Sequence, residues 1–127
     1  MSRTVILSAN APQPVSAYSQ AIQSGSLLFL AGQIPLDPST GKLVSGSIAE
    51  ETDRVIENLR AVLSAAGATL DNVVKTTVYL TNMADFSAFN LAYARHFTKD
   101  PPARTTVCVL ALPLGVRVEL EAIAALD

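Results

Sequence analysis

Two stretches of the chain repeat apolar residues at helical spacing. Ser47 and Glu50 have the spacing of a capping box, in which each side chain accepts the backbone N–H of the other residue. Apolar positions then recur on one helical face up to Ala66, and Gly67 suits the left-handed end of a helix. A second helix is predicted over residues 84–97. Its apolar stripe consists of Phe86, Phe89, Tyr93 and Phe97.

Shorter stretches have the composition of β-strands, because β-branched and apolar residues gather there between turn residues. They are predicted at residues 4–8, 21–24, 27–33, 73–80, 104–110 and 116–126. Residues 36–46 are predicted as a loop, since prolines and glycines interrupt them. The order of elements indicates an α+β fold, with a mostly antiparallel sheet and two helices on one face.

The strand predicted at residues 27–33 is apolar at consecutive positions from Leu27 to Ala31, so both of its faces require burial. Two helices cover only one face of a sheet. The other face would be a large exposed apolar surface in a monomer. The sequence therefore predicts a homo-oligomer whose sheets pack face to face.

Composition narrows the class of protein. The 127 residues, 50% hydrophobic and 16% charged, suit one domain over residues 1–127. A net charge of -2 without a Lys/Arg cluster argues against a nucleic-acid partner. No apolar run suits a signal peptide or a membrane span, so a cytoplasmic protein is expected. One cysteine, one histidine and no glycine-rich phosphate loop predict neither a metal site nor a nucleotide cofactor.

Two charged residues stand within apolar strand sequences near the C-terminus. Arg104 is either an arginine that reaches water from the start of its strand or a clamp for a carboxylate, since guanidinium offers a planar fork of donors. Glu119 shares a strand face with Arg117 and Glu121, and it belongs either to a solvated face or to a general acid/base site. If the two strands are neighbours, Arg104 and Glu119 line one pocket, which suits a small substrate with a carboxylate.

Tyr18 and Asn90 are two further polar candidates. Tyr18 precedes the second strand, a position typical of a ring packed in the core with its hydroxyl at the rim. Asn90 lies among apolar residues of the second helix. It either bonds a neighbouring loop or donates into a pocket, and its spacing leaves both roles open.

Several short motifs occur together in an order that is much more specific than any one of them. They are Tyr18-Ser19-Gln20-Ala21, Ala31-Gly32-Gln33-Ile34-Pro35, Asn58-Leu59, Val74-Lys75-Thr76-Thr77-Val78, Asp85-Phe86 with Asn90 and Tyr93, Pro102-Ala103-Arg104, Leu112-Pro113 and Val118-Glu119-Leu120-Glu121-Ala122-Ile123-Ala124. With these motifs the chain resembles the RidA/YjgF family of imine deaminases along almost its full length. The resemblance implies a chorismate-mutase-like α+β fold, assembled as a homotrimer with a central barrel and with active sites in clefts between subunits.

The resemblance also implies an activity, that of a 2-iminobutanoate/2-iminopropanoate deaminase. Such an enzyme hydrolyses reactive 2-imino acids, formed from the enamines 2-aminoacrylate and 2-aminocrotonate, to 2-oxo acids and ammonia. It uses no cofactor or metal, and it is linked in function to the pyridoxal-phosphate-dependent dehydratases that release the enamines.

Residue roles follow from the same resemblance. Arg104 would bind the substrate carboxylate with both arms of its guanidinium, and Glu119 would position a water and assist its attack on the imine carbon. Four more residues would line or support the pocket: Tyr18 by closing it, Gly32 through its backbone, Asn90 by supporting the site, and Thr106 beside the substrate.

The chain departs from the family pattern at three places, which bear on the size of the substrate and the lining of the pocket. Ser16-Ala17 replaces a frequent Gly-Pro, Ala31 replaces a common serine, and the loop 99–102 before Arg104 is short. Alternatives are a deaminase of another enamine or imine acid, aminomuconate-like or 3-aminoacrylate-like, a non-catalytic regulatory trimer that binds a small acid, and an RNA-cleaving protein. The joint presence of Arg104 and Glu119 argues against a purely binding role, and the acidic balance argues against RNA.

Overall fold

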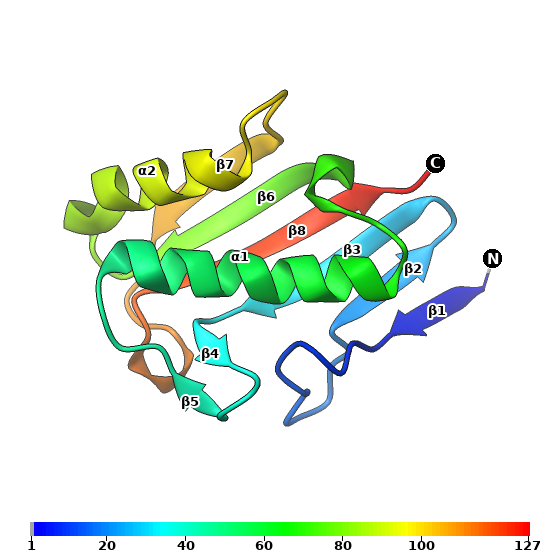
Figure 1. The fold of residues 1–127 in the computed structure, drawn as a ribbon, viewed down its shortest axis with the longest axis horizontal. Coiled ribbons are helices and arrows are strands. Elements are labelled where there is room, and N and C mark those ends of the chain that lie inside the picture. The colour runs from blue at the N-terminus through cyan, green and yellow to red at the C-terminus, as the bar shows by residue number, and fades with distance from the viewer. Residues whose placement is uncertain (1) are drawn as a thin grey trace.

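The main element of the fold is a six-stranded sheet, seen in a computed structural model that describes residues 2–127 (Figure 1). Across the sheet the strands follow the order β1 (Arg3–Ile6), β2 (Ala21–Ser24), β3 (Leu27–Gln33), β8 (Val118–Ala125), β6 (Val73–Leu80) and β7 (Ala103–Cys108). Two helices, α1 (Ile48–Ala65) and α2 (Phe86–His96), lie over one face. The predicted α+β fold is therefore confirmed.

The sheet is mixed, since neighbouring strands are antiparallel except for β6 and β7. The exception has a simple cause. Because α2 is the crossover between β6 and β7, the chain re-enters the sheet in the same direction. The final strand, β8, then returns between β3 and β6, at the centre of the sheet. This central place buries the strand that carries Glu119.

Several predicted boundaries differ from the structure, since α2 spans Phe86–His96 instead of 84–97 and β7 spans Ala103–Cys108 instead of 104–110. The segment 36–46 is not entirely loop, because β4 (Leu36–Asp37) pairs antiparallel with β5 (Lys42–Leu43) in a small hairpin. Gly41 in the hairpin turn has a φ of 73°, a conformation that favours glycine. The last strand begins at Val118 rather than at residue 116, because a short 3-10 turn over Pro113–Gly115 precedes it.

The ends of α1 agree with the sequence. Ser47 Oγ accepts the N–H of Glu50 at 3.1 Å, and Glu50 Oε1 accepts the N–H of Ser47 at 3.2 Å. At the other end Gly67 has a φ of 74°, and the N–H of Ala68 donates to the carbonyl of Leu63 at 2.9 Å. Both ends therefore satisfy backbone groups that a helix leaves free. In the part of the chain that the structure describes, neither helix has the length and apolar character needed to cross a membrane.

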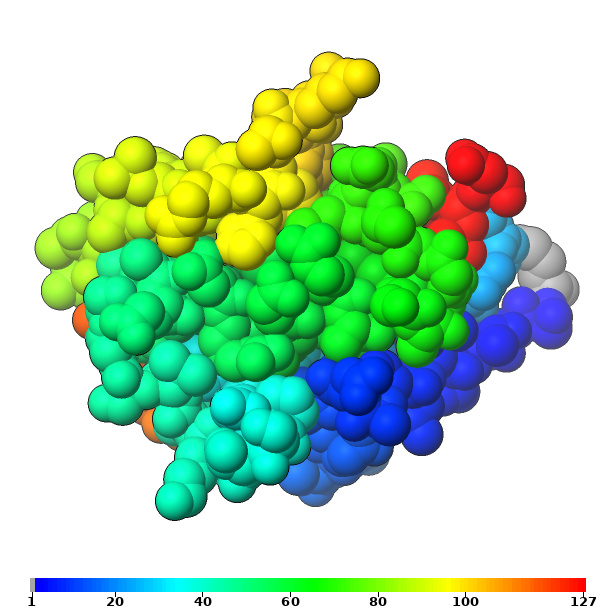
Figure 2. Space-filling view, viewed as in Figure 1, coloured from blue at the N-terminus to red at the C-terminus, as the bar shows by residue number. Residues whose placement is uncertain are grey.

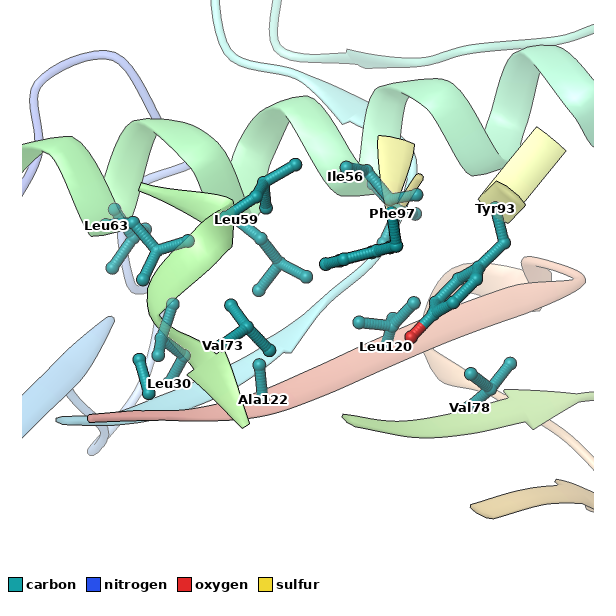
Figure 3. Close-up of a cluster of buried hydrophobic side chains, with 14 of the residues drawn as sticks. Leu30, Ile56, Leu59, Leu63, Val73, Val78, Tyr93, Phe97, Leu120 and Ala122 are labelled. Atoms are coloured by element: carbon teal, nitrogen blue, oxygen red, sulfur yellow. The ribbon is translucent and has the colours of Figure 1, made fainter. Parts of the chain in front are cut away.

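The hydrophobic core fills the space between the helices and the sheet (Figure 3). Removal of these side chains from water is the main favourable contribution to folding. The core residues labelled in the figure are Ile56, Leu59 and Leu63 of α1, Tyr93 and Phe97 at α2, and Leu30, Val73, Val78, Leu120 and Ala122 of the strands.

The strands turn one face to the helices and the other, which we call the open face, away from them. In β3, Leu28 and Leu30 are buried under the helices, whereas Leu27 and Phe29 point to the open face and are 40% and 43% exposed. Figure 2 shows the covered side of the molecule, where α1 crosses between α2 and the blue N-terminal segment. Within residues 2–127, Leu27 and Phe29 stay partly exposed. The burial expected for both faces of this apolar strand is therefore complete on only one of them.

Candidate active site

Glu119 lies on the open face of the central strand. Strand alternation places Leu120 under the helices and Glu119 on the other side, where it is half-buried. The pairing of β3 with β8 is irregular between Leu30 and Gln33, and Gly32 lies within this irregularity. A Cβ atom added to Gly32 would overlap Oε2 of Glu119 and lie 3.0 Å from its carboxyl carbon. Glycine at this position lets the backbone of β3 approach the carboxyl group closely.

The electrostatic surroundings of Glu119 favour its protonated form. Burial, and to a smaller extent the negative charge of Glu121, raise the pKa of Glu119 above its ordinary value. Glu121 lies two residues further along the same face, and its Oε1 accepts a hydrogen bond from the hydroxyl of Tyr79. A carboxyl group with a pKa raised towards neutrality can both take up and release a proton, as general acid–base catalysis requires.

Tyr18 reaches the same region from the loop before β2. It lines a mostly apolar cavity of about 520 Å³ together with Gly32 and Glu119. Ala31, one of the departures from the family pattern, contributes to the same wall. Tyr18 is 51% exposed, so it is not the core residue that its sequence position suggested.

The loop that carries Tyr18 is held by the buried side chain of Gln20. Its Oε1 accepts the N–H of Ser8 at 2.6 Å, and its Nε2 donates to the carbonyls of Ser8 at 3.2 Å and Pro12 at 2.8 Å. For this reason the first strand ends at Ile6, short of the predicted Ser8. Gln20 belongs to one of the family motifs. Its side chain bonds the backbone of Ser8 where a strand partner would otherwise do so, and a single contact of this kind leaves no periodic signal in the sequence.

Arg104 lies on the edge strand β7, beneath α2. Its Nη2 donates to Oδ1 of Asn90 at 2.8 Å. The guanidinium carbon lies 4.9 Å from the ring centre of Tyr93, 5.6 Å from that of Phe89 and 5.9 Å from that of Phe86. Aromatic faces attract cations, so this wall and one amide hold the guanidinium in place. The group carries more donors than the contact with Asn90 uses, which suits it to a carboxylate.

Thr106 follows Arg104 on the same face of β7. Its Oγ1 is buried and has no hydrogen-bond partner among residues 2–127. A buried hydroxyl without a partner lowers stability, and such a group calls for an explanation. A ligand or a second chain that reached this face would supply the missing bond.

Arg104 and Glu119 do not meet within one chain. The strands β7 and β8 are not neighbours, because β6 lies between them. Arg104 is paired in register with Thr76, which is buried under the helices, whereas Glu119 is paired with Tyr79 on the open face. The two charged side chains therefore project from opposite faces of the sheet. The condition for a shared pocket, that the two strands are neighbours, is therefore not met within a single copy of the chain.

Arg117 also differs from its predicted place. The sequence suggested that it shares the face of Glu119 and Glu121, but it precedes β8, so the alternation of that strand does not apply to it. Its Nε donates to Oε2 of Glu51 at 3.0 Å, and its Nη2 donates to the carbonyl of Gly46 at 2.7 Å. Arg117 thus neutralises a buried carboxylate of α1 and leaves Glu121 as the charged neighbour of Glu119 on β8.

Tyr79 is a site residue that sequence reasoning missed. The alternation of residues 73–80 places it on one face of a strand, and this much is visible in the sequence. Its pairing with Glu119 depends on the register between β6 and β8, which are separated by a helix and a further strand in the chain. No local pattern carries that register.

The fold is that of a small α+β protein with a mixed sheet and two helices. Its two charged clusters, around Arg104 and around Glu119, mark the class of protein further. The sequence profile described as Endoribonuclease L-PSP matches residues 8–126. A RutC family protein of Pyrococcus horikoshii is 51% identical over 122 residues, which cover 96% of this chain and 97% of that protein. The 2-iminobutanoate/2-iminopropanoate deaminase of Mus musculus is 47% identical over 122 residues, covering 96% of this chain and 90% of the enzyme.

A solved structure gives the same result for the fold. The crystal structure of E. coli TdcF with bound serine superimposes with a TM-score of 0.94 at 33% identity, covering 98% of this chain and 99% of that one. The chain therefore belongs to the RidA/YjgF/L-PSP family, and the resemblance drawn from its motifs is confirmed.

Proposed function

We propose that this protein is a deaminase that hydrolyses 2-imino acids to 2-oxo acids and ammonia, and that it acts as a homotrimer with its active sites between subunits. One subunit would contribute the cluster of Arg104, Asn90 and Thr106. Its neighbour would contribute the cluster of Glu119, Gly32 and Tyr18.

The observation that carries this proposal is the separation of Arg104 from Glu119. Arg104 is fixed by Asn90 and an aromatic wall on the covered face, and Glu119 is half-buried beside Gly32 on the open face. One chain thus holds a half suited to binding a carboxylate and a half suited to activating water, and the two face apart. A head-to-tail contact that repeats around a three-fold axis would join each half to the complementary half of the next subunit.

The open face gives a second reason for assembly. Leu27 and Phe29 are large apolar side chains exposed on this face, and apolar side chains grouped on one face are typical of an interface. Packing of three such sheets around an axis would form the central barrel that the family resemblance implies. Both parts of the proposal, the deaminase reaction and the trimer, therefore depend on the same observation, which is what the two faces of the sheet carry.

The chemistry requires few groups. Arg104 would hold the substrate carboxylate, which places the imine carbon next to the water at Glu119. The reacting species is the imine protonated on nitrogen. As the oxygen of this water bonds to its carbon, the C=N electron pair moves to nitrogen, the carboxylate of Glu119 accepts one proton of the water, and a neutral carbinolamine forms. Glu119 then returns this proton to the amine nitrogen. The C–N bond breaks as the hydroxyl oxygen forms the carbonyl and gives its proton to Glu119, which releases ammonia and leaves the 2-oxo acid.

The names of relatives support this choice of substrate. The mouse relative is named as a 2-iminobutanoate/2-iminopropanoate deaminase, and TdcF was crystallised with serine, a small molecule that carries a carboxylate. The enamine precursors would come from pyridoxal-phosphate-dependent dehydratases. A panel of imino acids generated in place by a dehydratase, with imine decay followed with and without the protein, tests the reaction and the preferred substrate.

The shared site has a test of its own. The variants Arg104→Ala and Glu119→Gln are expected to be nearly inactive when each is assayed alone. Unfolding and refolding them together at equal amounts would mix their subunits at random. An intact site would then form wherever a chain with Arg104 meets a neighbour with Glu119, which is about one quarter of all sites in a cyclic trimer. Activity that stays at the level of the single variants after mixing would rule out a shared site.

Two alternative functions are separated by the same assays. An aminomuconate-like or 3-aminoacrylate-like substrate would appear in the panel as a different preferred acid. The description Endoribonuclease L-PSP in the family profile points to RNA instead. The chain carries 9 basic and 11 acidic residues, a balance that does not favour a phosphate backbone. RNA cleavage by the wild-type protein, together with no imine hydrolysis by the same preparation, would favour that function over the deaminase.

A further inference from the structure

The open face carries an acidic pair that the proposed mechanism does not use in full. Glu119 and Glu121 project from the same side of β8, and a small cavity beside them is lined by both carboxyl groups together with Gly32, Tyr79 and Leu112. Two carboxylates on one strand face repel each other, and such an arrangement is destabilising unless something compensates it. Glu121 has a defined partner for its charge, whereas Glu119 is the group that stands next to the larger cavity of Tyr18.

The partner of Glu121 is the hydroxyl of Tyr79. In the register of β6 with β8, Tyr79 lies opposite Glu119 and Thr77 lies opposite Glu121. The tyrosine ring therefore passes diagonally across the strand pair to reach the second carboxylate, a distance that aromatic side chains span. Its hydroxyl donates to Oε1 of Glu121. The bond to this carboxylate raises the pKa of Tyr79, so the tyrosine remains a donor at physiological pH.

The groups that face Glu119 can be named for each neighbouring element. On β8 the facing group is the charged carboxylate of Glu121, and on β6 it is the neutral phenol of Tyr79. The loop before β2 contributes Tyr18 to the shared cavity, and β3 contributes the backbone of Gly32. Lys75 lies further along β6, and its ammonium group donates a hydrogen bond to Thr105 Oγ1 at 2.8 Å. Within one chain this leaves Glu121 as the charge fixed beside Glu119, and in the proposed trimer the neighbouring subunit would add the guanidinium of Arg104.

We propose that Tyr79 and Glu121 are positioning residues that act through Glu119: the tyrosine hydroxyl fixes the Glu121 carboxylate, and this fixed negative charge favours the proton-bound form of Glu119. The inference rests on the proposed function, because it makes Glu119 a stronger base for the attacking water. A base is most effective when its proton affinity matches the working pH. Tyr79 and Glu121 themselves need not touch the substrate.

Titration of the Glu119 carboxyl group tests this proposal directly. Nuclear magnetic resonance of isotope-labelled glutamate side chains follows each carboxyl carbon with pH, and Glu119→Gln identifies the signal of interest. In Glu121→Gln the midpoint of the Glu119 titration should fall. In Tyr79→Phe it should fall by a smaller amount, because Glu121 loses the bond that stabilises its charge. Glu57→Gln, which removes an exposed carboxylate of α1, should leave the midpoint in place.

The double variant Tyr79→Phe with Glu121→Gln makes the test sharper. If Tyr79 acts only by fixing Glu121, the double variant should have the same Glu119 midpoint as Glu121→Gln alone. A further fall in the double variant would show that Tyr79 acts on Glu119 directly and would overturn the proposed order of action. An unchanged midpoint in Glu121→Gln would overturn the proposal altogether.

Kinetics provide the functional counterpart. With Glu119 as base, the acidic limb of kcat/KM should move to lower pH in Glu121→Gln, so the ratio of activity at about pH 5 to that at about pH 8 should be higher than in wild type. A uniform loss of activity with an unmoved limb would indicate a merely structural role and contradict the inference. The titration requires no turnover, so the two proposals can fail separately. A protein inactive on imines would refute the deaminase proposal. The titration midpoints would still decide whether Glu121 acts on Glu119.

Discussion

The carboxyl group of Glu119 occupies the space that a side chain at Gly32 would need. A Cβ atom at Gly32 would overlap Oε2 of Glu119 and lie 3.2 Å from its Cγ. The two residues lie on adjacent strands, at the point where the pairing of β3 with β8 becomes irregular. Irregular pairing of this kind re-aims side chains near active sites, and in this sheet it brings a backbone against a carboxyl group.

Gly32→Ala should displace the carboxyl group of Glu119 without unfolding the chain. Gly32 does not have a positive φ, so its backbone accepts alanine, and the added methyl group acts through the contact alone. A misplacement of catalytic groups by about 1 Å can cost on the order of 10²-fold in rate, and we expect a loss of at least about tenfold in kcat. The dehydratase-coupled assay measures it.

Gly41→Ala is the matched control for this substitution. Gly41 has a φ of 73°, an added Cβ there would meet no atom within 4 Å, and the residue does not line the cavity of Glu119. Alanine there should lower stability by roughly 1 kcal/mol and leave kcat unchanged. If Gly32→Ala has the same kcat as wild type, the close approach of the β3 backbone to the Glu119 carboxyl group is not needed for catalysis.

Asn90→Ala should weaken substrate binding more than the chemical step. The amide oxygen of Asn90 fixes Nη2 of Arg104 at 2.8 Å, and without it the guanidinium has the aromatic wall as its remaining guide. A hydrogen bond to a charged group contributes about 1.5–3 kcal/mol, so KM should rise roughly tenfold or more. Steady-state kinetics on a 2-imino acid separate KM from kcat.

Arg104→Lys is the companion variant at the same cluster. It keeps the positive charge but loses the planar fork, so it should recover only part of the activity that Arg104→Ala removes. Full activity in Arg104→Lys would mean that a point charge suffices and that the orientation supplied by Asn90 has no role.

Glu119→Gln should change the pH dependence of stability in a defined direction. Because burial raises the pKa of Glu119, the folded chain binds this proton more tightly than the unfolded chain. The resulting contribution to stability is present below the ordinary pKa of glutamate and is lost as the pH rises through the folded value. Glutamine does not titrate, so the melting temperature of Glu119→Gln relative to wild type should be higher at about pH 7 than at about pH 4.

Thermal melts at one fixed chain concentration measure this difference, since assembly makes melting temperatures concentration-dependent. Glu57→Gln serves as the control, because the carboxylate of Glu57 is exposed on α1 and pairs with Arg60 at 3.3 Å. A relative melting temperature of Glu119→Gln that is the same at both pH values would contradict a raised pKa for Glu119 in the folded chain.

Phe29→Glu should prevent assembly. Phe29 is 43% exposed on the open face, and a charge at the centre of a packed apolar interface is strongly unfavourable. Sedimentation equilibrium should find a trimer for wild type and smaller species for Phe29→Glu. Leu7→Glu is the matched control, since Leu7 is 62% exposed beside α1 and apart from both proposed half-sites. A Phe29→Glu trimer, or dissociation by Leu7→Glu alone, would place the interface elsewhere.

Local features of the fold could be predicted because their causes are local. The capping box at Ser47 and Glu50 and the left-handed Gly67 are set by residues within one turn of helix. The hairpin of β4 and β5 escaped prediction because strands of two residues are too short to show alternation. Proline and glycine in the same segment indicated a turn, and one is present.

The arrangement of the candidate site could be predicted only in part. The sequence indicated that Arg104 and Glu119 are unusual charges on strands, but it left open whether their strands are neighbours. Instead β8 takes the centre of the sheet, where the helices cover its alternate residues Leu120 and Ala122, and β7 stays at the edge. Strand order depends on which apolar face needs the deepest burial across the whole domain. Spacing within a single segment does not contain that information.

The opposite-face placement of Arg104 and Glu119 has a consequence for dilute protein. In the proposed trimer, each site exists only while two chains are in contact, so the number of working sites follows mass action. Specific activity per chain would then fall on dilution below the dissociation constant of the assembly and return on concentration. The amount of chain in a compartment would set the rate of imine removal more steeply than in direct proportion.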